Sequence, residues 1–266
     1  MKRLNIFAKG NLDVRDSLHS LRMDGELRWN GINQALKMNG IAVTARVRHE
    51  TSLGAEATIA STGIVPAVFD GHDIPLGAYP LATQFGRKIF EASPDVFVLS
   101  IQPDIQLTNA RHGQERFLFY PDGMDRWQAV QRDWLKREFH PEPLICAGAA
   151  MDHMEKLIGC LRATNDVPIL VYNMSSVVRG ETLHRHAGQE DILSTRIKRF
   201  NLALVELSQR SGISIVDVDR LVAQGGAETM KMDTNHLTER GCHAVANEVI
   251  HILQDHGCIA PREGMA

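Results

Sequence analysis

The sequence has no apolar run that approaches the roughly 20 residues of a membrane-spanning helix. Its formal net charge is only −3 and it contains no block of like charge, so neither a nucleic acid nor an anionic membrane surface is expected as a partner. The basic start, "MKRLNIFAKGN", carries an apolar segment too short for a signal peptide. We therefore expect a cytoplasmic protein that binds a small or neutral molecule.

Motifs for metals and nucleotides are also scarce. The four cysteines lie far apart without a CxxC pair, which argues against a zinc knuckle and a disulfide framework. His184 and His186 have no nearby cysteine or carboxylate cluster, so a metal site is not expected there. Gly10 stands alone, without the further glycines or the lysine of a phosphate-binding loop. We expect no cofactor and no metal.

What the sequence does contain is the composition of an ordinary folded protein. Apolar residues make up 44% and charged residues 23% of the 266 positions. This length fits one large domain or two small ones. We predict a single domain over residues 1–266.

Five short segments rich in β-branched residues alternate with helix-like sequence, the pattern of a parallel sheet covered on both faces. The fold class is therefore α/β, with three layers. Helices are predicted over 192–212 and from about 238 to 257, the second with Thr238 as its N-cap. The predicted strands are 3–8, 41–50, 95–101, 167–173 and 213–219.

The periodic pattern weakens between the third and fourth predicted strands. Residues 103–150 carry aromatic residues, charges and prolines without a steady period. A connection of this length is usually functional or forms a small subdomain. We predict that it is an insertion that caps the carboxyl edge of the sheet.

The stretch "MDTNHLTERG" places Asp233 and His236 just before the last predicted helix. An aspartate three residues before a histidine in a turn can bring its carboxylate to one imidazole nitrogen. That contact fixes the tautomer and leaves the other nitrogen free as a base. The spacing thus predicts two members of a catalytic triad.

This stretch resembles the last sequence block of the SGNH, or GDSL, hydrolase superfamily, whose pattern is Asp-x-x-His-Leu-Thr-x-x-Gly. "TSLGAEA", with Gly54, is similar to the second block, and "DVFVLSIQPDI" is similar to the third strand and the block after it. The resemblance covers most of the chain in order. It implies a flavodoxin-like α/β/α fold with five parallel strands and a serine esterase without a cofactor.

The nucleophile is the point where the sequence departs from the family. The family places Gly-Asp-Ser directly after the first strand, whereas this chain reads "AKGNLDVRDSL". One alignment uses the literal Asp-Ser-Leu at 16–18 and needs a longer turn; the other places Leu12 at the serine position, which makes the site dead or altered. We predict Ser17 as the nucleophile, with Asp16 in reserve. A helix cap is the structural alternative for Ser17.

The oxyanion donors are altered as well. The family's third block is Gly-x-Asn-Asp, with the asparagine as a donor, but the segment here is "SIQPD". Gln102 can offer an equivalent amide, and Asp104 matches the final aspartate. The backbone N–H of Gly54 is the other predicted donor, and Asn173 is a reserve. Because losing one donor typically costs about a hundredfold to a thousandfold in rate, the substitution lowers the expected efficiency.

Together these residues imply a serine hydrolase that cleaves a carboxylic ester on a carbohydrate or small metabolite, with His236 as general acid and base and Asp233 as its orienting partner. One alternative is an acyltransferase, in which an alcohol replaces water as acceptor. The other is a catalytically dead binding protein, the outcome if Leu12 occupies the serine position. The sequence defines no oligomeric state.

Overall fold

A parallel β-sheet between two layers of helices forms the body of the computed structural model, which describes residues 2–23, 26–178 and 192–260. The strand order is β10-β9-β5-β1-β4, and every neighbouring pair runs parallel. The five predicted strands are confirmed as β1 (Lys2–Lys9), β4 (Val43–Glu50), β5 (Val96–Ser100), β9 (Ile169–Tyr172) and β10 (Ser214–Val216).

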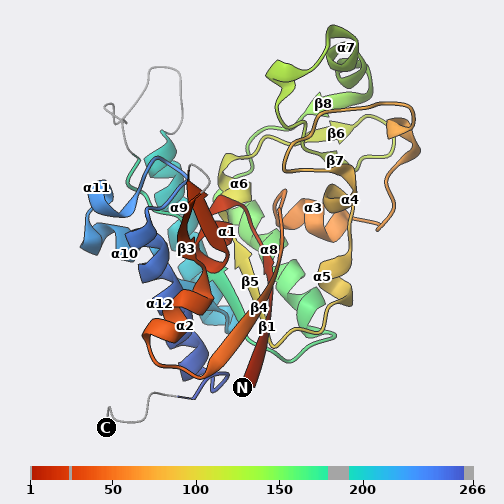
Figure 1. Cartoon of the computed structure of the whole chain (residues 1–266). Helices are drawn as coiled ribbons and strands as arrows, with labels where there is room; N and C mark the ends of the chain where they lie inside the picture. The colour runs from red at the N-terminus through yellow and green to blue at the C-terminus, as the bar shows by residue number, and fades with distance from the viewer. Residues whose placement is uncertain (1, 24–25, 179–191, 261–266) are drawn as a thin grey trace.

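The helices form two layers, one on each face of the sheet (Figure 1). The first layer contains α1 (Leu12–Leu18), α2 (Ile32–Met38), α10 (Val218–Gly225), α11 (Ala227–Met230) and α12 (Glu239–Asp255). The second contains α3 (Ala55–Ala60), α5 (Lys88–Glu91), α8 (Ala147–Arg162) and α9 (Leu193–Ser211). Both predicted helices are confirmed as α9 and α12, and Thr238 Oγ1 caps α12 by accepting from the N–H of Gly241 at 3.2 Å.

Alternating side chains of the strands supply a separate core to each layer. In β1, Leu4 and Ile6 belong to the core beneath α12, whereas Phe7 belongs to the core beneath α8. In β5, Val98 and Leu99 divide between the two cores in the same way. Because side chains of a strand point alternately to opposite faces, a strand covered on both sides must be apolar throughout. This explains the short apolar runs in the sequence.

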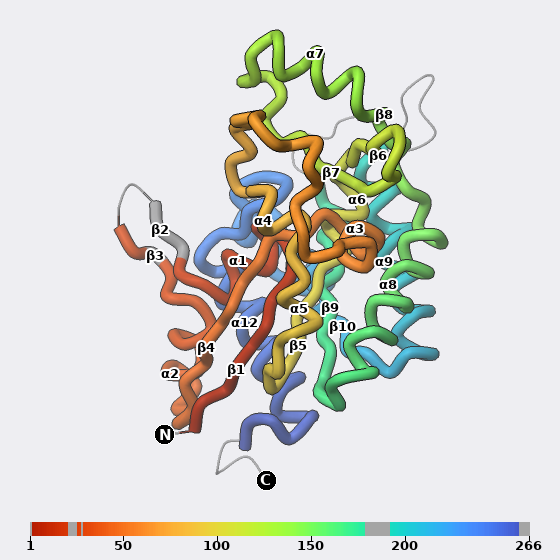
Figure 2. The backbone as a smooth tube through the Cα atoms, turned by 90° about the vertical axis from the view of Figure 1, so that its right-hand side faces the viewer, coloured from red at the N-terminus to blue at the C-terminus, as the bar shows by residue number. Residues whose placement is uncertain are grey.

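A second, small sheet lies beyond the carboxyl end of the main sheet (Figures 1 and 2). It is antiparallel, in the order β7-β6-β8, and the predicted cap region 103–150 contains it. The elements there are α6 (Gln102–Gln106), β6 (Ala110–His112), β7 (Leu118–Phe119), the 3-10 turn η2 (Met124–Arg126), α7 (Ala129–Glu138) and β8 (Phe139–Pro141).

The small sheet has an aromatic core of its own. Phe69 lies with its ring centroid 4.9 Å from that of Phe119, and the rings of Trp134 and Phe139 are 5.4 Å apart. Phe69 belongs to η1 (Ala67–Phe69), and Phe85 follows α4 (Leu81–Gln84) and packs into the same cluster. The subdomain therefore uses residues 67–85 as well as the predicted cap region.

One pair of strands beside the first helix layer was not predicted from the sequence. They are β2 (Ser20–Met23) and β3 (Glu26–Asn30), which pair antiparallel. Trp29, in β3, is fully buried in the core beneath α12. In the part of the chain that the structure describes, no helix combines the length and the apolar character needed to cross a bilayer.

Candidate active site

The sheet order defines where a ligand should bind. The chain passes from β1 to β4 on one side and then to β5 on the other, so the strand order reverses between β1 and β5. Open parallel sheets bind ligands outside the carboxyl ends of the strands at such a reversal. Three segments reach this place: the turn after β1, the residues after β5 and the turn that precedes α12.

The turn before α12 holds the Asp233–His236 pair in the predicted geometry. His236 Nδ1 lies 2.7 Å from Asp233 Oδ2, and because a carboxylate can only accept, Nδ1 carries the proton. His236 is 35% exposed and Asp233 57% exposed. Within the described residues, Nε2 of His236 has no hydrogen bond, so an oriented basic nitrogen faces outward from the turn.

Backbone groups of the same turn keep Asp233 ionised. Partial desolvation alone would raise the pKa of Asp233. The N–H groups of His236 and Asn235, each 2.8 Å from Asp233 Oδ1, and the imidazole of His236 act in the opposite direction. Together they hold the pKa of Asp233 below its ordinary value, so the carboxylate is available to orient His236.

A chain of hydrogen bonds connects the ends of β1 and β5 to this turn. Ser100 Oγ, at the end of β5, donates to the carboxylate of Asp13 in the first turn of α1. The backbone N–H of Gln102 donates to Ser100 Oγ at 2.9 Å, and its side-chain Nε2 donates to Asn235 Oδ1 at 3.2 Å. The start of α1 and the His236 turn therefore belong to one connected site.

Asp13 is perturbed within this chain. Desolvation raises the pKa of Asp13 to about 6, although the hydrogen bond from Ser100 favours the charged form. Sequence reasoning did not single out this residue. A signal for it was present in the sequence, because Asp13 is an acidic residue three positions after Gly10, which follows the first strand.

Ser17 is not part of this site, so the prediction that it is the nucleophile is wrong. Its side chain is fully buried, its Oγ donates to the carbonyl of Asp13 at 2.9 Å, and it lies 3.1 Å from the hydroxyl of Tyr172. Within a helix, a serine hydroxyl commonly bonds back to the carbonyl four residues earlier. The capping alternative is also wrong, since Asn11 is the N-cap of α1.

Replacing Ser17 by alanine should affect stability and leave chemistry unchanged. The change removes a buried hydroxyl and the hydrogen-bond partner of Tyr172, so we expect the free energy of unfolding to fall by about 1–2 kcal/mol. Urea titration measures this, and Ser20→Ala, at an exposed serine just after α1, is the matched control. A hundredfold loss of ester hydrolysis in Ser17→Ala, with the fold intact, would reverse our assignment.

The strand-to-helix turn is short, and Leu12, the serine position in one of the two family alignments, is the first residue of α1. β1 ends at Lys9 and α1 begins at Leu12, so only two residues separate the strand from the helix. Gly10 is required there, because a Cβ would lie 2.6 Å from Cγ2 of Val14 and 3.0 Å from Cβ of Ser100. The turn is therefore tight and lacks the extra residues that the alignment with Ser17 needs; the alignment with Leu12 at the nucleophile position stays a prediction.

Gly54 and Asp104 pack against each other beside this turn. Gly54 has a φ of 106°, and a Cβ there would lie 2.4 Å from Asp104 Oδ1, so both backbone and space require glycine. Asp104 accepts from the N–H of Ala55 at 3.2 Å. The N–H of Gly54 points to Ser52 Oγ at 3.1 Å. Its role as an oxyanion donor stays a prediction.

Gln102 is 3% exposed and lies after β5, as expected for the altered third block. One N–H of its amide goes to Asn235, while its Oε1 is buried without a partner among the described residues. The structure thus places Gln102 beside the His236 turn, and its function as an oxyanion donor stays a prediction.

Of the three reserve residues, Asp16, Asn173 and Asp104, the first two also have structural contacts. The Nδ2 of Asn173 donates to Asp217 at 2.7 Å, and its Oδ1 accepts from the N–H of Asp219 at 3.1 Å, so Asn173 joins the end of β9 to the start of α10. Asp16 is 2% exposed and accepts from Arg15 at 2.8 Å. Asp16 is therefore held in the interior beside Ser17, and its reserve catalytic role stays a prediction.

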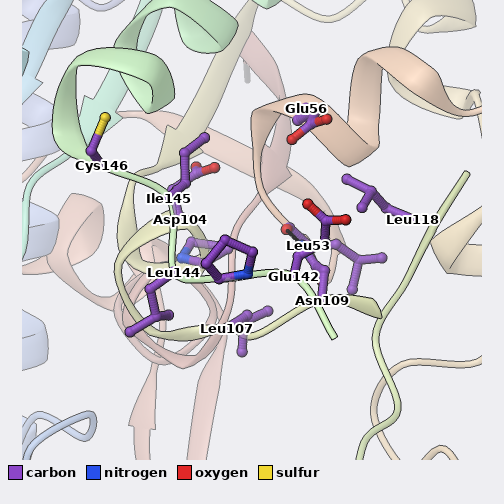
Figure 3. Close-up of a pocket in the computed structure, with 12 residues that line it drawn as sticks. Leu53, Glu56, Asp104, Leu107, Asn109, Leu118, Glu142, Leu144, Ile145 and Cys146 are labelled. Carbon is purple, nitrogen blue, oxygen red and sulfur yellow. Dashed lines mark hydrogen bonds between the residues drawn. The ribbon is translucent and has the colours of Figure 1, made fainter. Parts of the chain in front are cut away.

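A cavity of about 260 Å³ adjoins Gly54 on the side of the small sheet (Figure 3). Glu56 and Glu142 line it with their carboxylates near each other, and Arg111 binds both carboxylates at 2.8 Å. Asp104 lines the same cavity. Desolvation raises the pKa of Asp104 to about 7, although the N–H of Ala55 favours its charged form. The other residues that line the cavity are mainly aliphatic: Leu53, Leu107, Leu118, Leu144 and Ile145.

The pKa of Asp104 predicts a pH dependence of stability. Between the ordinary pKa of 3.8 and about 7, the unfolded chain loses the proton while the folded chain keeps it, so stability falls as pH rises. From pH 5 to pH 8 this contribution is about 2–3 kcal/mol. Asp104→Asn keeps an acceptor for Ala55 and should show a smaller fall in urea titrations. Equal slopes in both proteins would contradict the assignment.

The described residues contain no group of three or more histidine, cysteine, aspartate or glutamate side chains able to hold a metal ion. His184 and His186, which were not expected to bind metal, lie outside the described residues. The described site is thus built from an aspartate–histidine pair, amides and backbone N–H groups.

A three-layer α/β/α fold with a five-stranded parallel sheet and an Asp-x-x-His turn before the last helix is typical of the SGNH-type fold class. The structural comparison agrees: the chain is similar to the crystal structure of the lipase/acylhydrolase from Enterococcus faecalis, with a TM-score of 0.50 at 10% identity, covering 99% of this chain and 100% of that one. The chain therefore has a divergent SGNH-like fold, and the predicted fold class is confirmed.

Two further solved structures are more distant in geometry. One is an acetyl xylan esterase, with a TM-score of 0.49 at 12% identity over 94% of this chain and 99% of that one. Another is a member of the lipolytic G-D-S-L family from Veillonella parvula, with a TM-score of 0.47 at 10% identity over 96% of this chain and 99% of that one. No protein-family model and no curated protein sequence matches the chain.

Proposed function

We propose that this protein is an ester hydrolase in which the Asp233–His236 pair acts as a general base. The observation that carries the proposal is the 2.7 Å contact between Asp233 Oδ2 and His236 Nδ1, in a turn where the imidazole is 35% exposed. A histidine held in one tautomer, with its second nitrogen open to solvent, is suited to accept a proton from a nucleophile.

Water is the nucleophile in this proposal, because Ser17 is buried and Leu12, the serine position in the other alignment, has no hydroxyl. Nε2 of His236 takes a proton from water as the oxygen attacks the ester carbonyl. The tetrahedral intermediate then expels the alcohol, which takes the proton back from His236, and a carboxylic acid remains. A general base of this kind contributes about a hundredfold to ten-thousandfold.

The developing oxyanion would be held by the predicted donors, the backbone N–H of Gly54 and the amide of Gln102. Gln102 follows β5, which borders the reversal of the sheet, and is already hydrogen-bonded to the His236 turn, whereas Gly54 follows the neighbouring edge strand β4. The Gly54 N–H would have to exchange Ser52 Oγ for the substrate oxygen. We propose a carboxylic ester of a carbohydrate or other small metabolite as substrate; the neighbour from Enterococcus faecalis is described as a lipase/acylhydrolase.

The experiment that tests this function is release of acid from a panel of acetyl and longer acyl esters of sugars and small alcohols. We expect saturable release above the uncatalysed rate, without a burst, because no acyl enzyme forms. Transfer to added alcohols should not compete with hydrolysis. A folded protein that releases no acid from any of these esters would refute the proposal.

Two observations favour a second candidate, an SGNH-like binding protein without catalysis. Leu12 offers no nucleophile, and the hydroxyl of Ser17 is enclosed by α1 and Tyr172. Under this candidate, the same esters bind, detected by calorimetry, but are recovered intact. The His236→Ala variant separates the two candidates, because it alters turnover in the first and only affinity in the second.

A further inference from the structure

Asn235 makes side-chain contacts that link the catalytic turn to the opposite wall of the site. Its Oδ1 accepts from Gln106 Nε2 at 2.8 Å and from Gln102 Nε2 at 3.2 Å. Both glutamines belong to α6, which follows β5. The backbone N–H of Asn235 donates to Asp233 Oδ1 at 2.8 Å. Asn235 thus connects the carboxylate of Asp233 to α6.

Several other bonds hold the turn together, and Lys231 Nζ also ties its start to the carbonyl of Val177 at 2.7 Å. Lys231 and Leu237 form a β-bridge, and the N–H of Met232 donates to the carbonyl of His236 at 2.9 Å. The N–H of Thr238 donates to the carbonyl of Met230 at 3.0 Å. These bonds close the turn on itself. The contacts of Asn235 are the ones that join the turn to α6, directly after β5.

The geometry of Gln102 agrees with a role for Asn235 in joining the turn to α6. Its amide is buried, and a proton of Nε2 is committed to Asn235 while Oε1 has no partner among the described residues. Burying the amide of Gln102 costs free energy, and a hydrogen bond offsets part of that cost. The bond that Nε2 makes therefore favours the orientation that the amide adopts. That bond is the one to Asn235.

We infer that Asn235 is a positioning residue, which clasps the Asp233–His236 turn to α6 through Gln102 and Gln106. The kinetic part of this inference rests on the proposed hydrolase function, whereas the structural part does not. The clasp sets the direction of the imidazole toward the reversal of the sheet. A misplacement of about 1 Å at a catalytic group can cost about a hundredfold in rate, so the clasp affects turnover more than binding.

The test compares Asn235→Leu, which keeps the side-chain size and removes the acceptor, with Thr234→Val, an isosteric change at the adjacent position. A proton of the imidazole Nδ1 that is hydrogen-bonded to Asp233 gives a far-downfield NMR signal. We expect Asn235→Leu to lose or broaden this signal and to lower kcat about tenfold to a hundredfold at nearly constant KM. Thr234→Val should retain both.

A second variant, Gln106→Leu, breaks the 2.8 Å bond from a residue outside the turn and keeps the inference testable if Asn235→Leu does not fold. It should broaden the signal and reduce kcat by a smaller factor. A wild-type signal and wild-type kcat in Asn235→Leu, or in Gln106→Leu, would overturn the clasp. If the wild-type protein hydrolyses no ester, the signal alone decides about the clasp, and only the hydrolase proposal fails.

Discussion

Replacing His236 by alanine is expected to reduce kcat for ester hydrolysis by about a hundredfold to ten-thousandfold, because the variant removes the only proton acceptor in the proposed mechanism. KM should change little, since the imidazole acts on water. Steady-state assays of the purified variant measure both quantities. His251→Ala is the matched control, because His251 is an exposed histidine on α12, the helix that follows the catalytic turn.

Asp233→Asn extends this test to the pair. It leaves the side-chain size unchanged and removes the charge that orients Nδ1 of His236, so we expect a large loss of kcat. The double variant with His236→Ala should be little worse than His236→Ala alone, since residues that act as a unit give non-additive losses. Losses that multiply would show that the two residues do not share one mechanism.

Replacing Leu12 by serine is expected to create covalent reactivity that the natural chain lacks. Position 12 starts α1 directly after the tight turn at Gly10, where the SGNH family keeps its nucleophile, and the same site contains His236. A fluorophosphonate probe reacts with an activated serine. We therefore expect no labelling of the natural protein and clear labelling of Leu12→Ser at position 12, detected by peptide mapping.

Two controls make this result specific. Leu12→Ser combined with His236→Ala should lose the label, because the new hydroxyl then has no base. Leu12→Ser combined with Ser17→Ala should keep it, because Ser17 is enclosed in α1. Labelling of the natural chain at Ser17 would show that this serine becomes accessible in solution, and would restore the original nucleophile assignment.

The fold was predictable because it depends on local patterns. A strand buried on both faces must be apolar along its length, so all five strands of the main sheet stand out as short β-branched runs. The aspartate–histidine pair was predictable for a similar reason, since its two residues lie only three positions apart in one turn.

The remaining site depends on geometry that no local pattern contains. The Asp-Ser-Leu motif suggested a nucleophile, but its meaning depends on where α1 starts, and a helix that starts at Leu12 turns Ser17 inward. Asn235 was not singled out, because its partner Gln106 is 129 residues away in sequence. The aromatic core of the small sheet gathers residues from 69 to 139 without a steady period.

That aromatic core has a consequence for the motions of the protein. Phe69, Phe119, Trp134 and Phe139 pack on one another, and the two cores of the main sheet are made of other residues. A part of a protein with its own packed cluster can unfold and refold as a separate cooperative unit. The small sheet has such a cluster and meets the main fold through Leu118, which packs with Leu53 and Ala57, so we expect it to open without loss of the main sheet. Local opening of this kind would uncover the cavity beside Gly54 while the Asp233–His236 turn, anchored in α12 and α6, stays in place.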